Sequence, residues 1–122
     1  MEKVQVFKNE EFGSVRAIER NGEPWFIGKD MAEILGYTNT AKAIRDHVDD
    51  EDKLTERIVL SGQNREAFLI NESGLYSLIL GSKLPSAKRF KHWVTSEVLP
   101  TIRKTGGYVH NDDMFIKYLS SL

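Results

Sequence analysis

The segment 84–104 constrains the fold most, because it is the longest part of the chain with a regular helical repeat. Its apolar residues recur at spacings of three and four, which places them on one side of a helix. They are Ala87, Phe90, Val94, Val98 and Ile102. Pro85 suits the first turn of this helix, whereas Pro100 predicts a kink in its interior. Such a helix is either a strut of the core or a phosphate-binding surface.

The same segment is the most basic part of the chain. Between positions 81 and 107 there are six Lys or Arg residues against the single acid Glu97, although the whole chain has 17 basic and 18 acidic residues. Lys91 falls within the apolar arc, and we expect its stem to lie along neighbouring apolar surface. A solvated helix face gives the same pattern as a phosphate track. The predicted phosphate contacts are Lys83, Lys88, Arg89, Arg103 and Lys104.

Short alternating segments upstream predict a small antiparallel sheet. Residues 4–7 have the pattern of a strand, and 14–20 and 24–27 flank Asn21-Gly22, a dipeptide that favours the type I′ turn of a hairpin. The apolar residues expected to form one side of the core are Phe12, Val15, Ile18, Trp25 and Phe26.

A second hairpin is predicted from 54–60 and 65–70, which surround a four-residue loop at 61–64. A hairpin that follows two helices can act as a wing along the DNA backbone, and Arg57 and Arg65 are its candidate contacts. Acidic neighbours accompany both arginines, so a charged sheet edge that prevents aggregation explains the pattern equally well.

Residues 30–48 have the outline of a helix-turn-helix. Asp30 and Glu33 have capping-box spacing at the start of a first helix, Gly36 ends it, and a second helix is predicted over 40–48. The N-terminal half of the second helix in such motifs enters the major groove. Its candidate DNA contacts are Asn39, Thr40, Lys42 and Arg45.

Acidic residues limit how that second helix can meet DNA. Asp46 and Asp49 lie further along the same face and would repel phosphate if the helix lay flat, so we expect an end-on approach. We place sequence reading at 39–45 and treat the long basic helix as a strut with a phosphate clamp on its outer face. A two-helix packing unit without DNA contacts has the same periodicity.

The remaining segments add two helices. Asn71 is expected to cap a helix that runs to Leu80. Residues 109–122 read as an amphipathic tail or a linker towards a further domain. The candidate contacts of a homodimer in that tail are Phe115, Ile116, Leu119 and Leu122.

Composition excludes several classes of function. The length of 122 residues suits one domain, and no apolar run approaches the ~20 residues of a membrane span. Without cysteine there is no disulfide, thiolate metal site or thiol catalysis. No nucleotide-cradling glycine motif and no recognisable catalytic or metal-ligand spacing is present, so we expect no enzyme, no cofactor and no metal. A cytoplasmic location, in a bacterial host or a virus-infected cell, is expected.

Five blocks that occur in order carry a resemblance to a known family. The blocks are EPWFIGKD at 23–30, AEILGY at 32–37, NESGLY at 71–76, AKRFKHWV at 87–94 and EVLP at 97–100. With them the chain resembles the Bro-N domain, the N-terminal domain of the baculovirus repeated open-reading-frame family, which phage and prophage antirepressors share. The match runs from about residue 4 to residue 108.

This resemblance implies an α+β domain, over 1–108, that binds double-stranded DNA at the front of a longer protein. In phage it suggests an antirepressor-type transcriptional regulator. The alternative is a module that inactivates a repressor protein by direct contact, without DNA. No catalytic residues follow from the resemblance.

Overall fold

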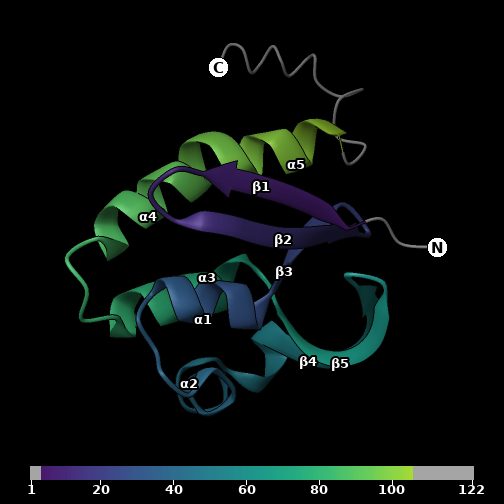
Figure 1. Ribbon diagram of the computed structural model, residues 1–122, viewed down its shortest axis with the longest axis horizontal. Coiled ribbons are helices and arrows are strands. Elements are labelled where there is room, and N and C mark those ends of the chain that lie inside the picture. The colour runs from purple at the N-terminus through teal and green to yellow at the C-terminus, as the bar shows by residue number, and fades with distance from the viewer. Residues whose placement is uncertain (1–3, 106–122) are drawn as a thin grey trace.

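The computed structural model describes residues 4–105, and within them a five-stranded antiparallel sheet is packed against helices (Figure 1). This confirms the α+β class. The strand order is β1-β2-β3-β5-β4. The strands are β1 (Gln5–Asn9), β2 (Gly13–Arg20), β3 (Glu23–Ile27), β4 (Lys53–Leu60) and β5 (Gln63–Ile70).

The helices follow the two groups of strands. Two of them, α1 (Gly28–Ile34) and α2 (Thr40–His47), stand between β3 and the short 3-10 turn η1 (Asp50–Asp52). The others come after β5. They are α3 (Glu72–Gly81), α4 (Ala87–Trp93), the π turn η2 (Val94–Val98) and α5 (Leu99–Thr105). The predicted dimer contacts Phe115, Ile116, Leu119 and Leu122 lie outside the described residues.

The hairpins of β2 with β3 and of β4 with β5 are closed by two-residue turns. Asn21 and Gly22 have φ angles of 55° and 79°, which confirms the predicted type I′ geometry. In the second hairpin, Ser61 and Gly62 have φ angles of 52° and 78°. The four-residue loop predicted there is wrong, because Gln63 pairs with Leu60 and the ladder continues from that pair. Ser61 adopts a left-handed conformation that serine seldom takes, so residue type alone does not indicate the two-residue turn.

The sheet has apolar residues on both faces, which corrects the expectation of a single core side. Val15, Ala17 and Phe26 face the helices, whereas Ile18 and Trp25 pack on the opposite face. Successive strand residues point to opposite faces, so the five could not share one side. The second, smaller core consists of Ile18, Ile27, Leu60 and Leu69 with partly buried neighbours.

The hairpin of β4 and β5 curls away from the rest of the sheet (Figure 1). Only two residue pairs, Phe26 with Ile70 and Ile27 with Leu69, join β5 to β3. Arg20 of β2 donates a hydrogen bond of 2.7 Å to Glu56 of β4, and this ion pair links the two parts of the sheet across the second core. The hydrogen bond from Arg20 lowers the pKa of the Glu56 carboxyl.

The helix α1 begins earlier than predicted. It starts at Gly28, and Asp30 is not its cap but a buried residue of its first turn, 9% exposed. A Cβ at Gly28 would lie 2.6 Å from Cδ1 of Ile44, so the absence of a side chain lets α1 and α2 approach. At the other end, Gly36 has φ = 90°, as expected of a helix-ending glycine. Asn71 caps α3 as predicted, accepting a hydrogen bond from the Gly74 N–H at 2.9 Å.

The basic segment is a helix whose apolar side is buried as predicted, including Phe90, Val94, Val98 and Ile102. It starts at Ala87, so Pro85 precedes it and does not occupy its first turn. Its irregularity lies ahead of Pro100, as a π turn in which the Leu99 N–H reaches back to the Val94 carbonyl.

Candidate nucleic-acid interface

The outer face of α4 and α5 is less cationic than its composition suggests. Arg89 donates to Glu11 at 3.0 Å through Nε, and Arg103 donates to Glu72 at 2.6 Å. The hydrogen bond from Arg89 holds the pKa of the Glu11 carboxyl below its usual value. Lys88 and Lys104 are exposed, and neither makes an ion pair within residues 4–105. The predicted phosphate track is therefore interrupted by carboxylates.

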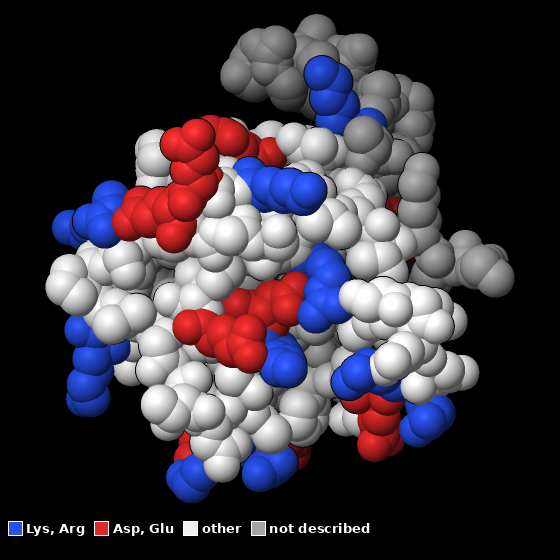
Figure 2. Space-filling view, in the orientation of Figure 1, with Lys and Arg blue, Asp and Glu red and all other residues white. Residues whose placement is uncertain are grey.

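The remaining lysines of that segment do not complete the track. Lys83 is exposed in the loop before α4. Lys91 is exposed too, with Nζ 5.9 Å from the centre of the Tyr76 ring, so it lies over an aromatic side chain. In the view of Figure 2, acidic side chains lie among the basic ones, and this face has no continuous basic surface.

At the start of α2, two of the four predicted DNA contacts already have intramolecular roles. The Asn39 side chain caps the helix by accepting from the Lys42 N–H at 3.0 Å. The Lys42 ammonium donates to Asp46 at 2.6 Å, and this bond lowers the pKa of the Asp46 carboxyl. Arg45 is exposed and makes no ion pair with the described part of the chain. Thr40 faces a pocket.

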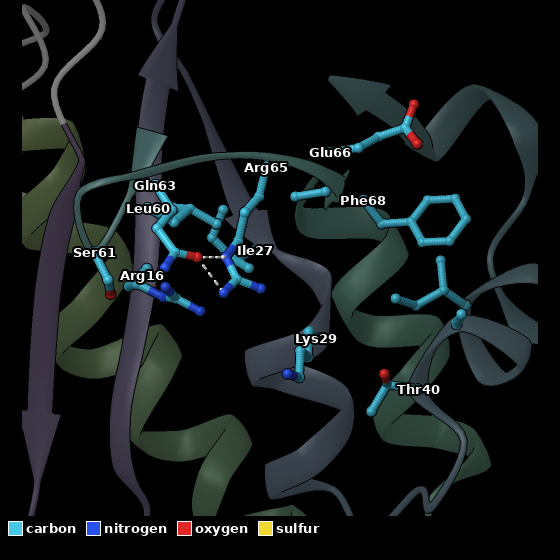
Figure 3. A pocket seen from close by; sticks show the side chains of 13 residues that line it. Arg16, Ile27, Lys29, Thr40, Leu60, Ser61, Gln63, Arg65, Glu66 and Phe68 are labelled. Atoms are coloured by element: carbon cyan, nitrogen blue, oxygen red, sulfur yellow. Dashed lines mark hydrogen bonds between the residues drawn. The ribbon is translucent and has the colours of Figure 1, made fainter. Parts of the chain in front are cut away.

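This pocket, of about 480 Å³, lies between α1 and α2 on one side and the curled β4–β5 hairpin on the other (Figure 3). One part of its wall is apolar and is formed by residues of the second core together with residues of α2. The apolar lining residues are Ile27, Ala41, Ile44, Leu60, Ala67 and Phe68. Its polar lining residues are Arg16, Lys29, Thr40, Ser61, Gln63, Arg65 and Glu66.

Arg16 is held in place by Asp30. Its guanidinium donates to both carboxylate oxygens at 2.8 and 2.9 Å, and its backbone N–H donates to Oδ2 at 2.9 Å. The hydrogen bond to Asp30 raises the pKa of Arg16. Because the carboxylate compensates this cation, Arg16 contributes shape and hydrogen-bond donors to the pocket more than net charge.

The net positive charge at the pocket comes from Lys29 and Arg65. The Lys29 side chain is 65% exposed, and its Nζ is 3.9 Å from Glu33, which is a weak i,i+4 pair. Arg65 donates through Nε to the Gln63 side-chain oxygen at 2.9 Å, which fixes its orientation. In Figure 3, Glu66 points away from the cavity. Two cations therefore flank an opening without an acidic partner inside it.

The structure brings together only some of the predicted contacts. Thr40 of α2 and Arg65 of β5 line the same pocket, and Arg57 is exposed on the neighbouring strand β4. The long helix belongs to the same large core as α1 and α2, but none of its cations lines this pocket. Sequence reasoning missed Arg16, Lys29 and Gln63, since no local pattern indicates how the hairpin curls towards α1.

Other kinds of site find little support in the part of the chain that is described. Among residues 4–105, no group of three His, Asp or Glu side chains is placed to hold a metal ion. Over the same residues, no helix has the length and apolarity of a membrane span.

The fold and the pocket define an α+β domain in which a pair of short helices and a curved hairpin enclose a basic cleft. The model of the BRO family, N-terminal domain, matches residues 14–100. The chain therefore belongs to the BRO family of N-terminal domains, as its five sequence blocks indicated. This is not a known family of enzymes. The matched region is narrower than the range of 4–108 expected from the blocks.

Several relatives are similar to this chain, and proteins of viruses are among them. An uncharacterized protein of Haemophilus influenzae is 44% identical over 91 residues, which cover 75% of this chain and 45% of that protein. A putative Bro-N domain-containing protein, 289L of Invertebrate iridescent virus 6, is 39% identical over a region that covers 70% of this chain and 25% of the viral protein. An uncharacterized Bro-N domain-containing protein of Autographa californica nuclear polyhedrosis virus is 34% identical over a region that covers 84% of this chain and 36% of the viral protein.

The chain thus spans less than half the length of these relatives. No solved structure matches it significantly.

Proposed function

We propose that this domain binds double-stranded DNA through the face formed by the start of α2 and the β4–β5 hairpin. The observation that carries the proposal is the convergence of Lys29, Thr40 and Arg65 from three separate elements on one cleft. Arg45 and Arg57 are exposed on α2 and β4, and neither has an ion pair among residues 4–105. Cations without internal partners are available to replace the counterions of DNA phosphates.

The geometry favours an end-on approach of α2. Lys42 and Asp46 neutralise each other along the exposed side of the helix, so that side attracts phosphate weakly. The side chains of Asn39 and Lys42 already make hydrogen bonds within α2, to the Lys42 N–H and to Asp46. Thr40, at the first helical position, faces the cleft. The first backbone N–H groups of a helix also attract anions. We assign the hairpin the role of a wing beside the helix.

The family resemblance supports a proposal of a regulatory role. We propose that the domain acts in transcriptional regulation in a phage or prophage, as an antirepressor-type regulator, with sequence-dependent contacts made by the start of α2. The outer face of α4 and α5, where Lys88 and Lys104 remain, is a secondary phosphate clamp in this proposal.

Salt-dependent DNA binding tests the cleft. Each phosphate contact that is lost reduces the slope of log affinity against log salt by about 0.9 on duplex DNA. The double variant Lys29→Gln, Arg65→Gln should therefore lower the slope by about 1.8 between about 50 and about 200 mM salt, as measured by fluorescence anisotropy.

The matched comparison is Lys88→Gln, Lys104→Gln, which removes the same charge from the long helix. A smaller change of slope in this variant is expected, in line with a secondary clamp. An unchanged slope and affinity in the cleft variant would contradict the assignment of the interface.

The competing function is direct binding of a repressor protein. The observation in its favour is the pairing of Arg89 with Glu11 and of Arg103 with Glu72, which makes the long helix less suited to phosphates. Recovery of a repressor from a lysogen extract after nuclease treatment, together with no DNA binding by the purified domain, would favour this alternative.

A further inference from the structure

We propose that the pocket between α2 and the β4–β5 hairpin accepts one nucleotide, with its phosphate at Lys29 and Arg65 and its base on the apolar wall. The nucleotide has two possible sources, a free mononucleotide or an unpaired nucleotide that protrudes from a DNA strand. If the nucleotide belongs to a DNA strand, the proposal rests on the DNA-binding function proposed above and extends it. If it is a free mononucleotide, the proposal is independent of DNA binding.

The first argument is the composition of the wall. A groove that only follows a DNA backbone needs cations and no apolar lining. This pocket is lined by Ile27 and Ile44, which are nearly fully buried, and by the half-buried Phe68. Its volume of about 480 Å³ is in the range of small-molecule sites, which are mostly apolar with a few placed polar groups. The flat, weakly polar face of a base suits such a wall.

The second argument is the charge at the opening. Arg65 and Lys29, whose pair with the exposed Glu33 is weak, provide two cations. Arg16 is compensated by Asp30, and Glu66 points away from the cavity (Figure 3). An anion with two negative charges or a bridging phosphate therefore fits better than a cation or a neutral ligand. Arginine binds phosphate with two parallel N–H bonds, whereas lysine acts as a point charge.

The third argument is that the polar groups are oriented in advance. The Gln63 side-chain oxygen accepts from Arg65, so the amide N–H₂ group of Gln63 is left to donate to a ligand. The Thr40 hydroxyl lies on the opposite side of the pocket and both donates and accepts. Donors and acceptors near an apolar wall are what recognition of a base edge requires.

The experiment uses nuclear magnetic resonance titration of the full chain with each of the four deoxynucleoside 5′-monophosphates. We expect saturable shifts at residues 27–29, 40–44 and 63–68. Lys29→Gln should weaken binding by roughly tenfold or more, because a charge-assisted hydrogen bond is lost. Lys8→Gln, the same change on the distant edge strand β1, should leave binding unchanged.

Two further comparisons separate base recognition from phosphate recognition. Ala41→Phe fills the pocket from α2 and should abolish binding, while Ser73→Phe, at an exposed position of α3, should not. Deoxyribose 5-phosphate lacks the base and should bind much more weakly than the nucleotides. If it binds equally well, or if Ala41→Phe and Lys29→Gln both leave the titration unchanged, the proposal is overturned.

Duplexes distinguish the two sources. A duplex with one extrahelical nucleotide should bind more tightly than the fully paired duplex, and Ala41→Phe should remove that difference, if the nucleotide comes from DNA. Binding of the monophosphates without such a preference assigns the pocket to the free nucleotide. Absence of both effects overturns the pocket proposal, and the fully paired duplex then still reports separately on the proposed DNA binding.

Discussion

At the scale of single residues, Asp30 shows how a side chain can serve both fold and site. Its carboxylate accepts three hydrogen bonds from Arg16 while it is almost fully buried. The same contact ties α1 to β2 and positions the Arg16 guanidinium at the edge of the pocket. The capping-box spacing of Asp30 and Glu33 suggested a purely local role, because sequence spacing does not show that Arg16, 14 residues earlier on β2, lies against α1.

Replacement of the Asp30 carboxylate is expected to destabilise the folded state. Asp30→Asn removes the negative charge and leaves the partly buried Arg16 without its ion pair, so we expect a loss of about 2–3 kcal/mol in the free energy of unfolding. Urea denaturation measures it. Glu33→Gln, which alters the exposed pair with Lys29, should change stability by less than about 0.5 kcal/mol. Equal effects of the two substitutions would show that the Arg16 contact contributes little.

At the scale of elements, the π turn between α4 and α5 has two possible causes. Pro100 cannot donate a hydrogen bond, which disturbs the preceding turn. The buried residues Phe90, Val94, Val98 and Ile102 also repeat every four positions, and each such step overshoots a full α-helical turn by about 40°. The wider π turn rotates less per residue and returns these side chains to one face.

We expect the repeat of four to be the main cause. Pro100→Ala restores the missing N–H group, yet the π turn over Val94–Val98 should persist, because the same apolar side chains still have to face the sheet. A crystal structure of the variant measures this, because it shows whether the Leu99 N–H still bonds to the Val94 carbonyl. Conversion of the segment to a regular α-helix would assign the turn to proline instead.

The elements also show what local sequence can predict. The turn at Asn21-Gly22, the glycine that ends α1, the Asn71 cap and the buried side of the long helix depend on residues close in the chain, and all were predicted. The tight turn at Ser61-Gly62 was missed because its serine conformation is uncommon. The pocket was missed for a different reason, since Arg16, Lys29 and Gln63 meet only after the hairpin curls, which depends on pairing between distant segments.

At the scale of the whole molecule, a chain of polar contacts joins α3 to the long helix. The Tyr76 hydroxyl donates to Glu72 at 2.9 Å, Arg103 donates to the other Glu72 oxygen at 2.6 Å, and Lys91 lies over the Tyr76 ring. Burial first, and then the bond to the Glu72 carboxylate, raise the pKa of Tyr76 to about 12, while Arg103 partly opposes the shift. The neutral phenol is therefore the form that the folded molecule prefers.

This preference predicts a loss of stability in alkali. The folded pKa is above the unfolded value of about 10, so the folded state holds an additional proton between about pH 10 and about pH 12. The contribution of Tyr76 is fully present below about pH 10 and decreases as the pH rises through that window. Denaturant midpoints at about pH 9 and about pH 11 should show a steeper loss for the unmodified chain than for Tyr76→Phe, which cannot ionise.

Tyr37→Phe is the comparison for that measurement. Burial also raises the pKa of Tyr37, so its ionisation too lowers stability in alkali. Its hydroxyl donates to the Leu78 carbonyl and not to a carboxylate. We therefore expect Tyr37→Phe to flatten the alkaline decline less than Tyr76→Phe. If both variants decline as steeply as the unmodified chain, the contacts of Tyr76 do not connect α3 to the long helix strongly enough to affect folding, and lysine deprotonation accounts for the loss.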